Sequence, residues 1–166
     1  MRTHGCRIAL FAVFLIAGAQ YASGQSGNCT EKDSSTRPDC PSAIAFFDRM
    51  HAALEKDDHQ ALALLIHYPL RATIDHKPTL IRDQQQFLAH FDDIFSKGVR
   101  CEVLSASEKD VWGNWQGFTV GAGAIWFDSI IRAAEHPDPK AQDYWKKYPF
   151  KIITINNGSD YPCAGS

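Results

Sequence analysis

Five acidic or imidazole side chains stand beside apolar segments where acid–base chemistry could take place. They are His51, Asp75, His76, Asp92 and Asp128. Such chemistry needs two titratable groups in one apolar pocket, with pKa values that their surroundings push apart. The spacing of these five residues pairs none of them with another. Asp75 and His76 precede Lys-Pro and are more typical of a turn, and His51 and His67 are more typical of structural or surface histidines.

Arg71 is the strongest single candidate for ligand binding. It follows Tyr68-Pro-Leu in a segment whose alternation predicts a strand. If its guanidinium points inward it must pair with a carboxylate, because an unpaired buried charge is too costly. The simpler interpretation is an internal ion pair with Asp92, Glu102 or Asp128. The functional interpretation is a bidentate contact with a ligand carboxylate.

Large aromatic side chains concentrate in the second half of the chain. They are Trp112, Trp115, Phe118, Trp126 and Phe127. We expect most of them in the core, yet neighbouring strand residues face opposite sides of a sheet. Trp126 or Phe127 should therefore lie on an outer face, as an interface candidate. The candidates for lining a ligand pocket are Tyr68, Arg71, Asp92, Trp115 and Asp128.

Several functional classes lack their signatures. The formal net charge is −2, without a basic cluster, so nucleic acid is not an expected partner. Phosphate-loop, G-x-S-x-G and H-E-x-x-H motifs are absent from the sequence. We expect no cofactor and no metal.

The N-terminus has the pattern of a cleaved signal peptide over residues 1–24. Arg2 and Arg7 precede an uncharged apolar run over 8–17, and small residues precede Gln25. That run is about half the ~20 residues needed to cross a bilayer, so a membrane anchor is the weaker interpretation. We expect a periplasmic or secreted protein that is not inserted in the membrane after cleavage.

Four cysteines remain after the predicted cleavage site. They are Cys29, Cys40, Cys101 and Cys163. An even number in an oxidising compartment predicts two disulfides, with three pairings open. Cys29–Cys40 with Cys101–Cys163 is the favoured pairing. A zinc site is the weaker alternative, because no C-x2–4-C spacing is present.

The first half of the expected domain is helical. Residues 25–40 read as a flexible polar leader, and 41–166 as a single domain. Apolar spacing predicts a helix over 41–56 and a second, short one that Asp57 or Asp58 caps and that includes Ala61, Leu62, Leu64 and Leu65. A strand over 70–75 and a turn at 76–78 follow. Asp83 and Gln86 then predict the start of a helix that ends at Gly98.

The second half changes to a strand-like period. Alternation predicts a strand over 99–104, and aromatic and β-branched runs over 111–120 and 124–127 predict a hairpin around Gly121-Ala-Gly123. Residues 129–147 read as a loop with a helical piece, 150–155 as a strand and 156–158 as a turn. Helices followed by antiparallel strands indicate an α+β fold.

This order resembles the nuclear transport factor 2-like superfamily over roughly 41–156. The resemblance rests on Tyr68-Pro-Leu-Arg71, on Gly117-Phe-Thr-Val-Gly-Ala-Gly-Ala-Ile-Trp-Phe127 and on Lys151-Ile-Ile-Thr-Ile-Asn156. It is similar to small exported bacterial members, many without an assigned function. It implies a cone in which a curved antiparallel sheet wraps three N-terminal helices. The superfamily includes both enzymes and binding modules, so function must be argued from the site.

Two functions from different classes remain open. The first is an exported, non-enzymatic binding domain. It would recognise an envelope protein, in an accessory or toxin-neutralising role, or a small apolar ligand, and the sheet could also form a homodimer. The alternative is a small cofactor-independent isomerase, dehydratase or hydrolase acting in the cone. The first is favoured because no acid–base pair stands out in the sequence.

Overall fold

The computed structural model describes residues 27–29, 39–74, 76–131, 148–157 and 161. The fold of these residues is α+β, as expected. Its helices are α1 (Cys40–Glu55), α2 (His59–Leu64), α3 (Gln84–Ala89), α4 (Phe91–Ile94), α5 (Lys97–Ser105) and the 3-10 turn η2 (Glu108–Asp110). Its strands are β1 (Gly27–Asn28), β2 (Ile66–Ile74), β3 (Lys77–Ile81), β4 (Trp112–Asn114), β5 (Gly117–Val120), β6 (Ile125–Ser129) and β7 (Phe150–Asn157).

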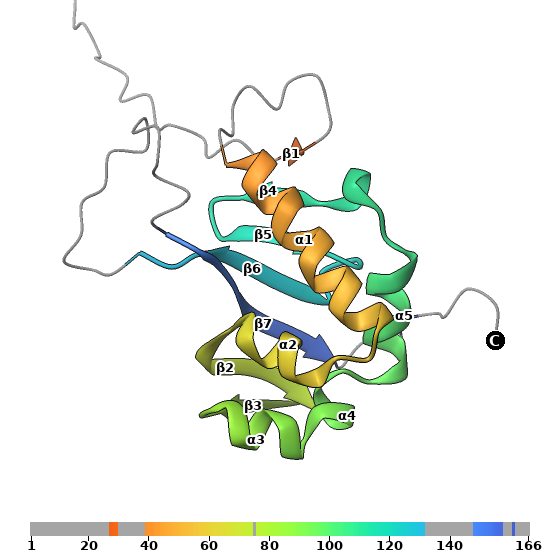
Figure 1. Cartoon of the computed structure of the whole chain (residues 1–166), viewed down its shortest axis with the longest axis vertical. Helices are drawn as coiled ribbons and strands as arrows, with labels where there is room; N and C mark the ends of the chain where they lie inside the picture. The colour runs from red at the N-terminus through yellow and green to blue at the C-terminus, as the bar shows by residue number, and fades with distance from the viewer. Residues whose placement is uncertain (1–26, 30–38, 75, 132–147, 158–160, 162–166) are drawn as a thin grey trace, which may run out of the picture.

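The strands form one open sheet in the order β1-β4-β5-β6-β7-β2-β3. The expected antiparallel sheet is wrong in one pairing, because β2 and β7 run parallel. This pairing joins the first long strand of the fold to its last, so strands from the two halves of the sequence are hydrogen-bonded neighbours within the sheet (Figure 1).

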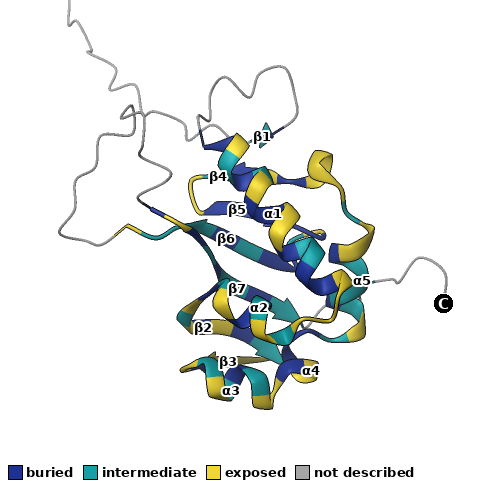
Figure 2. Cartoon of the chain, viewed as in Figure 1, coloured by how far each residue is buried: buried dark blue, intermediate teal, exposed yellow. Residues whose placement is uncertain are grey.

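The helices cover one face of the sheet. In Figure 1, α1 crosses in front of β4, β5 and β6, while α2 lies in front of β2 and β7. The core lies between these layers, where the buried segments of helices and strands face each other (Figure 2). Phe46 of α1 packs against Phe127 of β6, with ring centroids 5.0 Å apart, and against Phe150 of β7. The opposite face of the sheet carries no described helix.

Local capping sets the predicted helix starts. Asp58 caps α2 by accepting a hydrogen bond from the Ala61 amide at 2.9 Å. Asp83 accepts one from the Gln86 amide at 2.8 Å, and the Gln86 side chain accepts in return from the Arg82 amide. Both caps satisfy amides that the first turn of a helix leaves unpaired.

Two expectations for residues 83–104 are wrong. The helix after Asp83 does not run to Gly98 but divides into α3 and α4, and Gly98 lies in the first turn of α5. Residues 99–104 form part of α5 and not a strand. Val99 and Val103 are both buried, because a spacing of four residues places them on one helical face. Ser96 caps this helix by accepting from the Val99 amide.

The strand predictions are confirmed in outline and corrected in extent. The hairpin forms between β5 and β6, but 111–120 contains two strands, β4 and β5, separated by a turn at Trp115-Gln116. Residues 77–78, expected in a turn, belong to the edge strand β3, and 156–157 belong to β7. Strand β2 begins at Ile66, four residues before the expected start at Leu70.

The Cys29–Cys40 disulfide is confirmed and joins the turn after β1 to the first residue of α1. Gly27–Asn28, in the segment expected to be a polar leader, pairs with β4. Cys101 is also disulfide-bonded. Its expected partner Cys163, the predicted signal peptide 1–24 and the segment 132–147 lie outside the described residues.

Candidate functional site

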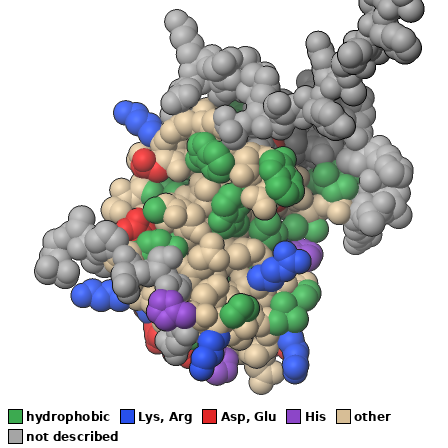
Figure 3. Space-filling view, turned by 180° about the vertical axis from the view of Figure 1, so that it is seen from behind, with side chains coloured by type: hydrophobic (Ala, Val, Ile, Leu, Met, Phe, Trp, Pro, Cys, Tyr) green, Lys and Arg blue, Asp and Glu red, His purple; other side chains and the backbone are tan. Residues whose placement is uncertain are grey.

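The outer face of the sheet, opposite the helices, carries a row of side chains from six adjacent strands. The register aligns the members of this row directly across the sheet, from β4 to β3. They are Trp112, Thr119, Trp126, Thr154, Arg71 and Leu80. Residues paired across strands point to the same face, so this row is a continuous surface of two tryptophans, two threonines, an arginine and a leucine. Hydrophobic side chains cluster on this face, and Lys, Arg and His side chains lie beside them (Figure 3).

Trp112 and Trp126 flank Thr119 within the row. Their rings meet edge to face, with centroids 6.5 Å apart. Thr119 is only 8% exposed, although it lies on the face without helices, and its hydroxyl donates a hydrogen bond to the Ile125 carbonyl at 2.9 Å. The indole pair therefore shields the centre of β5 from solvent on a face that no described helix covers.

Trp126 and Phe127 resolve the question of which neighbour faces outward. Phe127 is completely buried, where it contacts Phe46, Phe118 and Phe150 on the helical side. Trp126 is half-buried on the outer face. Of the two interface candidates, only Trp126 is on a surface.

Two open depressions lie on the outer face, and Arg71 lines both. The first has a volume of about 340 Å³ and is lined by Arg71, Gln116, Trp126, Ile153, Thr154 and Asn156. The second has a volume of about 470 Å³. It is lined by Arg71, Leu80, Asp128 and Ile153, by residues from the start of β2 and by residues at and after the end of β6. A bulge in β7 explains the place of Ile153. Trp126 pairs with Thr154 and Phe127 with Ile152, which leaves Ile153 as an extra residue between them.

Arg71 is exposed and points away from the core. The expectation of an internal ion pair is therefore wrong. Arg100 forms ion pairs with Asp57 and Asp92, and three histidines contact carboxylates, but no ion pair among the described residues involves Arg71. Because β2 is alternately buried and exposed from Leu70 to Ala72, the strand itself holds this guanidinium on the outer face.

The other pocket candidates do not converge with Arg71, apart from Asp128. Asp128 lines the second depression, and its carboxylate accepts a hydrogen bond from the Ser129 amide. Trp115 lies at the tip of the β4–β5 turn, where it is 79% exposed. Asp75 lies outside the described residues.

Tyr68 lies on the helical side of β2. Its hydroxyl donates a hydrogen bond to the Ala63 carbonyl of α2 at 3.3 Å. Burial, with a smaller contribution from the negative charge of Asp83, raises the pKa of Tyr68 to about 12. The neutral phenol is thus the form that the fold stabilises, and Tyr68 acts as a link between strand and helix.

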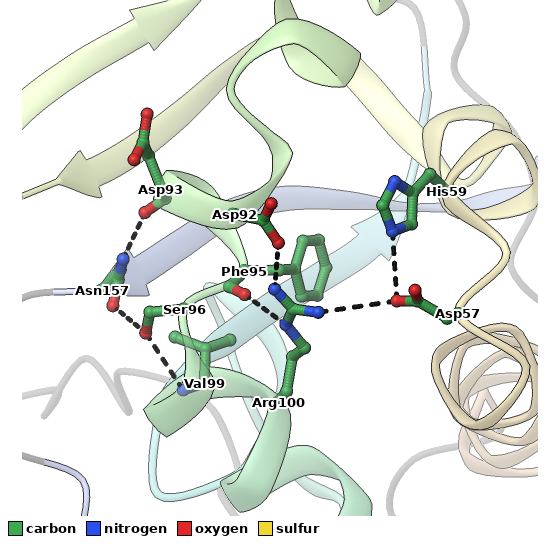
Figure 4. Close-up of polar contacts among 9 residues, drawn as sticks. All are labelled: Asp57, His59, Asp92, Asp93, Phe95, Ser96, Val99, Arg100 and Asn157. Carbon is green, nitrogen blue, oxygen red and sulfur yellow. Dashed lines mark hydrogen bonds and ion pairs between the residues drawn. The ribbon is translucent and has the colours of Figure 1, made fainter.

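Asp92 belongs to a separate polar cluster, which joins the turn before α2 to α4 and α5 (Figure 4). Arg100 is at its centre and forms ion pairs with Asp92 and, at 3.5 Å, with Asp57. The Arg100 Nε–H also donates to the Phe95 carbonyl at 2.6 Å. His59 contacts Asp57 and stacks on the Phe91 ring. With each side chain engaged by a neighbour, this cluster is a structural brace between helices.

The remaining histidines in the described part of the chain do not form an acid–base pair with one another. His51 contacts the Leu104 carbonyl and Glu55 on the helical side. His67 lines the second depression, and His76 is in the β2–β3 turn with φ of 62°. No group of three or more metal-ligating side chains occurs within the described ranges, and no described helix is long and apolar enough to cross a membrane.

Leu80, Thr154 and Gln116 were missed in the sequence. Leu80 belongs to β3, which was not predicted because its first two residues, Lys-Pro, are typical of a turn. Thr154 is placed by the bulge at Ile153, and Gln116 by the turn between β4 and β5. A signal for the row did exist, because Trp112 and Trp126 lie in the two aromatic runs around the predicted hairpin, but their alignment across β5 depends on the register of the strands.

The chain was compared with family models, with curated proteins and with solved structures, and none of the three comparisons finds a match.

Proposed function

We propose that the protein is an exported, non-enzymatic binding domain that recognises a protein partner through the outer face of its sheet. The observation that carries this proposal is the cross-strand row, which places Trp112, Trp126 and Arg71 on a surface that no described helix covers. Tryptophan and arginine are enriched among the residues that dominate binding energies. An aromatic face of this kind typically marks an interface.

The interior supports binding over catalysis. Among the described residues the buried polar side chains are Asp39 and Thr119, and the rest of the core is apolar. An acid–base reaction would need two titratable groups converging in a pocket. Tyr68 links β2 to α2 and the buried Asp39 precedes α1, and neither lines the two depressions. An accessory or toxin-neutralising role in the envelope is the form of binding that we propose.

The fold and compartment parts of this proposal rest on separate observations. A nuclear transport factor 2-like cone is supported by the order of two helices, the paired strands β2 and β3, further helices and then the antiparallel strands β4 to β7, and by helices on one face of the sheet. Export is supported by the Cys29–Cys40 disulfide, which suits an oxidising compartment.

Site-specific photo-crosslinking in the cell that makes the protein tests the binding face. A photoreactive residue at position 116 lies in the first depression, and one at position 56, at the end of α1, serves as the control on the helical side. We expect an adduct of defined mass from position 116 that is absent from position 56 and is lost on Trp126→Ser. An adduct with the mass of two chains would identify a homodimer. Equal adducts from both positions, or no effect of Trp126→Ser, would contradict the proposal.

A further inference from the structure

We propose that Arg71 pairs with the carboxylate of an acidic residue in the protein partner, and that apolar side chains next to this residue enter the two depressions beside Arg71. This inference rests on the proposed function, because it names the chemistry that the outer face recognises. The partner segment would thus carry a Glu or Asp between apolar residues.

The charge of Arg71 is not neutralised by any described carboxylate. No ion pair within the described ranges includes Arg71, although Asp128 lines the same depression. The nearby Lys151 directs its ammonium group to the Leu64 carbonyl, at 2.5 Å. Arg71 therefore presents, on the strand next to edge strand β3, a positive charge that no described carboxylate compensates, and this charge complements an acidic group on a partner.

The neighbours of Arg71 distinguish it from an ordinary solvated arginine. It lies between Thr154 and Leu80 in the row, and Leu80 is 52% exposed. Trp126 is two strands away, or about 10 Å at the usual strand spacing. An arginine fork next to aromatic and aliphatic surface suits a carboxylate held by two hydrogen bonds, whereas a point charge such as Lys would not hold it in a fixed plane.

The spacing of the two depressions suits an extended segment. In an extended chain, alternate side chains point to the same side and lie about 7 Å apart. A central acidic residue over Arg71 thus leaves its second neighbours within reach of the Trp126–Ile153 depression on one side and the Leu80 depression on the other. Edge pairing with β3 is the less suitable mode, because Pro78, the second residue of that five-residue strand, lacks an amide hydrogen.

The test uses two pentapeptide probes that differ only at the central residue. These are acetyl-Leu-Ser-Glu-Ser-Leu-amide and the same peptide with Gln in place of Glu. Binding is followed by NMR at the Arg71 Nε–H, the Trp126 indole N–H and the Thr154 amide. We expect the Glu peptide to bind about three- to fivefold more tightly than the Gln peptide, in the range of an exposed charge pair. This difference should disappear in 0.5 M NaCl.

Variants locate the effect at Arg71. Arg71→Gln should abolish the discrimination between the peptides, and Arg71→Lys should keep part of it. Arg49→Gln removes the same charge from the exposed surface of α1 on the helical side and should keep all of it. Inorganic phosphate and sodium glucuronate are titrated separately. Shifts at Arg71 from either, with equal binding of the two peptides, would overturn the peptide carboxylate in favour of a free anion or an acidic sugar.

The outcomes separate this inference from the proposed function. Equal binding of the two peptides, or full discrimination by Arg71→Gln, overturns the role of Arg71. If the Trp126-dependent adduct from position 116 is nevertheless formed, the binding face stands and only its carboxylate chemistry is wrong. If that adduct is also absent, the binding face itself is wrong.

Discussion

Trp112 and Trp126 belong to strands that are not neighbours, yet their indole rings are in edge-to-face contact, with centroids 6.5 Å apart. Strand β5 runs between them, and its small Thr119 leaves the space in which the rings meet. An aromatic pair of this geometry contributes about 0.5–1.5 kcal/mol beyond its buried area. The contact therefore fixes the relative orientation of the two rings on the outer face.

This contact should be measurable as a coupling between the two residues. We expect a double-mutant cycle of Trp112→Ala and Trp126→Ala, measured by urea unfolding, to give a coupling free energy of about 0.5–1.5 kcal/mol. Additive effects of the two substitutions would show that the rings do not stabilise each other in solution.

Adjacent residues of β6 should respond very differently to truncation. Phe127 is completely buried among three other phenylalanines, whereas Trp126 is half-buried on the outer face. Phe127→Ala should lower the free energy of unfolding by about 3–5 kcal/mol. Trp126→Ala should cost clearly less, about 1–2 kcal/mol. Thermal unfolding of both variants is the measurement, and equal losses would place Trp126 in the core.

The sequence was informative where local chemistry decides the structure. Asp58 and Asp83 predicted helix starts because a capping carboxylate binds amides only a few residues away. The hairpin between β5 and β6 was also predicted from local sequence, because its turn contains Gly121 and Gly123. The segment at Val99 and Val103 was wrongly predicted as a strand. A spacing of four residues places two side chains on the same face both in a strand, where side chains alternate, and in a helix. Long-range packing against the core decided in favour of the helix.

The candidate site was less predictable, because it depends on the register between distant strands. Arg71, Trp126 and Leu80 were brought together by the β2–β7, β6–β7 and β2–β3 pairings. The sequence named Arg71 and Trp126 separately but expected Arg71 to face inward. The parallel direction of the β2–β7 pairing does not determine which face of the sheet Arg71 lies on. It does decide that Arg71 aligns with Thr154 and hence with Trp126.

Gly117 should not tolerate a side chain. Its φ is +123°, and a Cβ there would lie 2.9 Å from the Phe127 carbonyl oxygen. Gly117→Ala combines a backbone conformation that L residues rarely adopt with a contact to rigid backbone. We expect a loss of about 2 kcal/mol or more in urea unfolding. Gly27→Ala is the matched control, because a Cβ at Gly27 has open space around it. Similar stability of the two variants would contradict this account.

Tyr68 should make stability fall at alkaline pH. Its pKa is raised from 10.0 to about 12 in the folded protein. Between these values the unfolded chain has lost more of this proton than the folded chain, so the free energy of unfolding decreases as pH rises. Below pH 10 the residue contributes no pH dependence. The stability difference between the wild type and Tyr68→Phe should therefore shift toward the variant from pH 10 to 12. An unchanged difference across that range would show that the phenol ionises normally.

The Cys29–Cys40 disulfide should hold β1 against the edge of β4. Strand β1 has only two residues, and the Cys29 amide donates to the Val111 carbonyl at 3.1 Å. Two residues of pairing do not compensate the entropy of ordering a chain end. The bond closes a short loop, since the cysteines are 11 residues apart, and the chain-entropy model gives about 3 kcal/mol for such a loop.

The double variant Cys29→Ser with Cys40→Ser should therefore unfold at lower urea concentration and lose the protection of the Cys29-position amide from hydrogen exchange. Cys101→Ser is the control. It removes the other described disulfide-bonded cysteine, which lies in α5, and should leave exchange at position 29 unchanged. If that amide remains protected in the double variant, the backbone pairing of β1 is stable without the bond. The disulfide would then stabilise the fold by another route, through the first turn of α1.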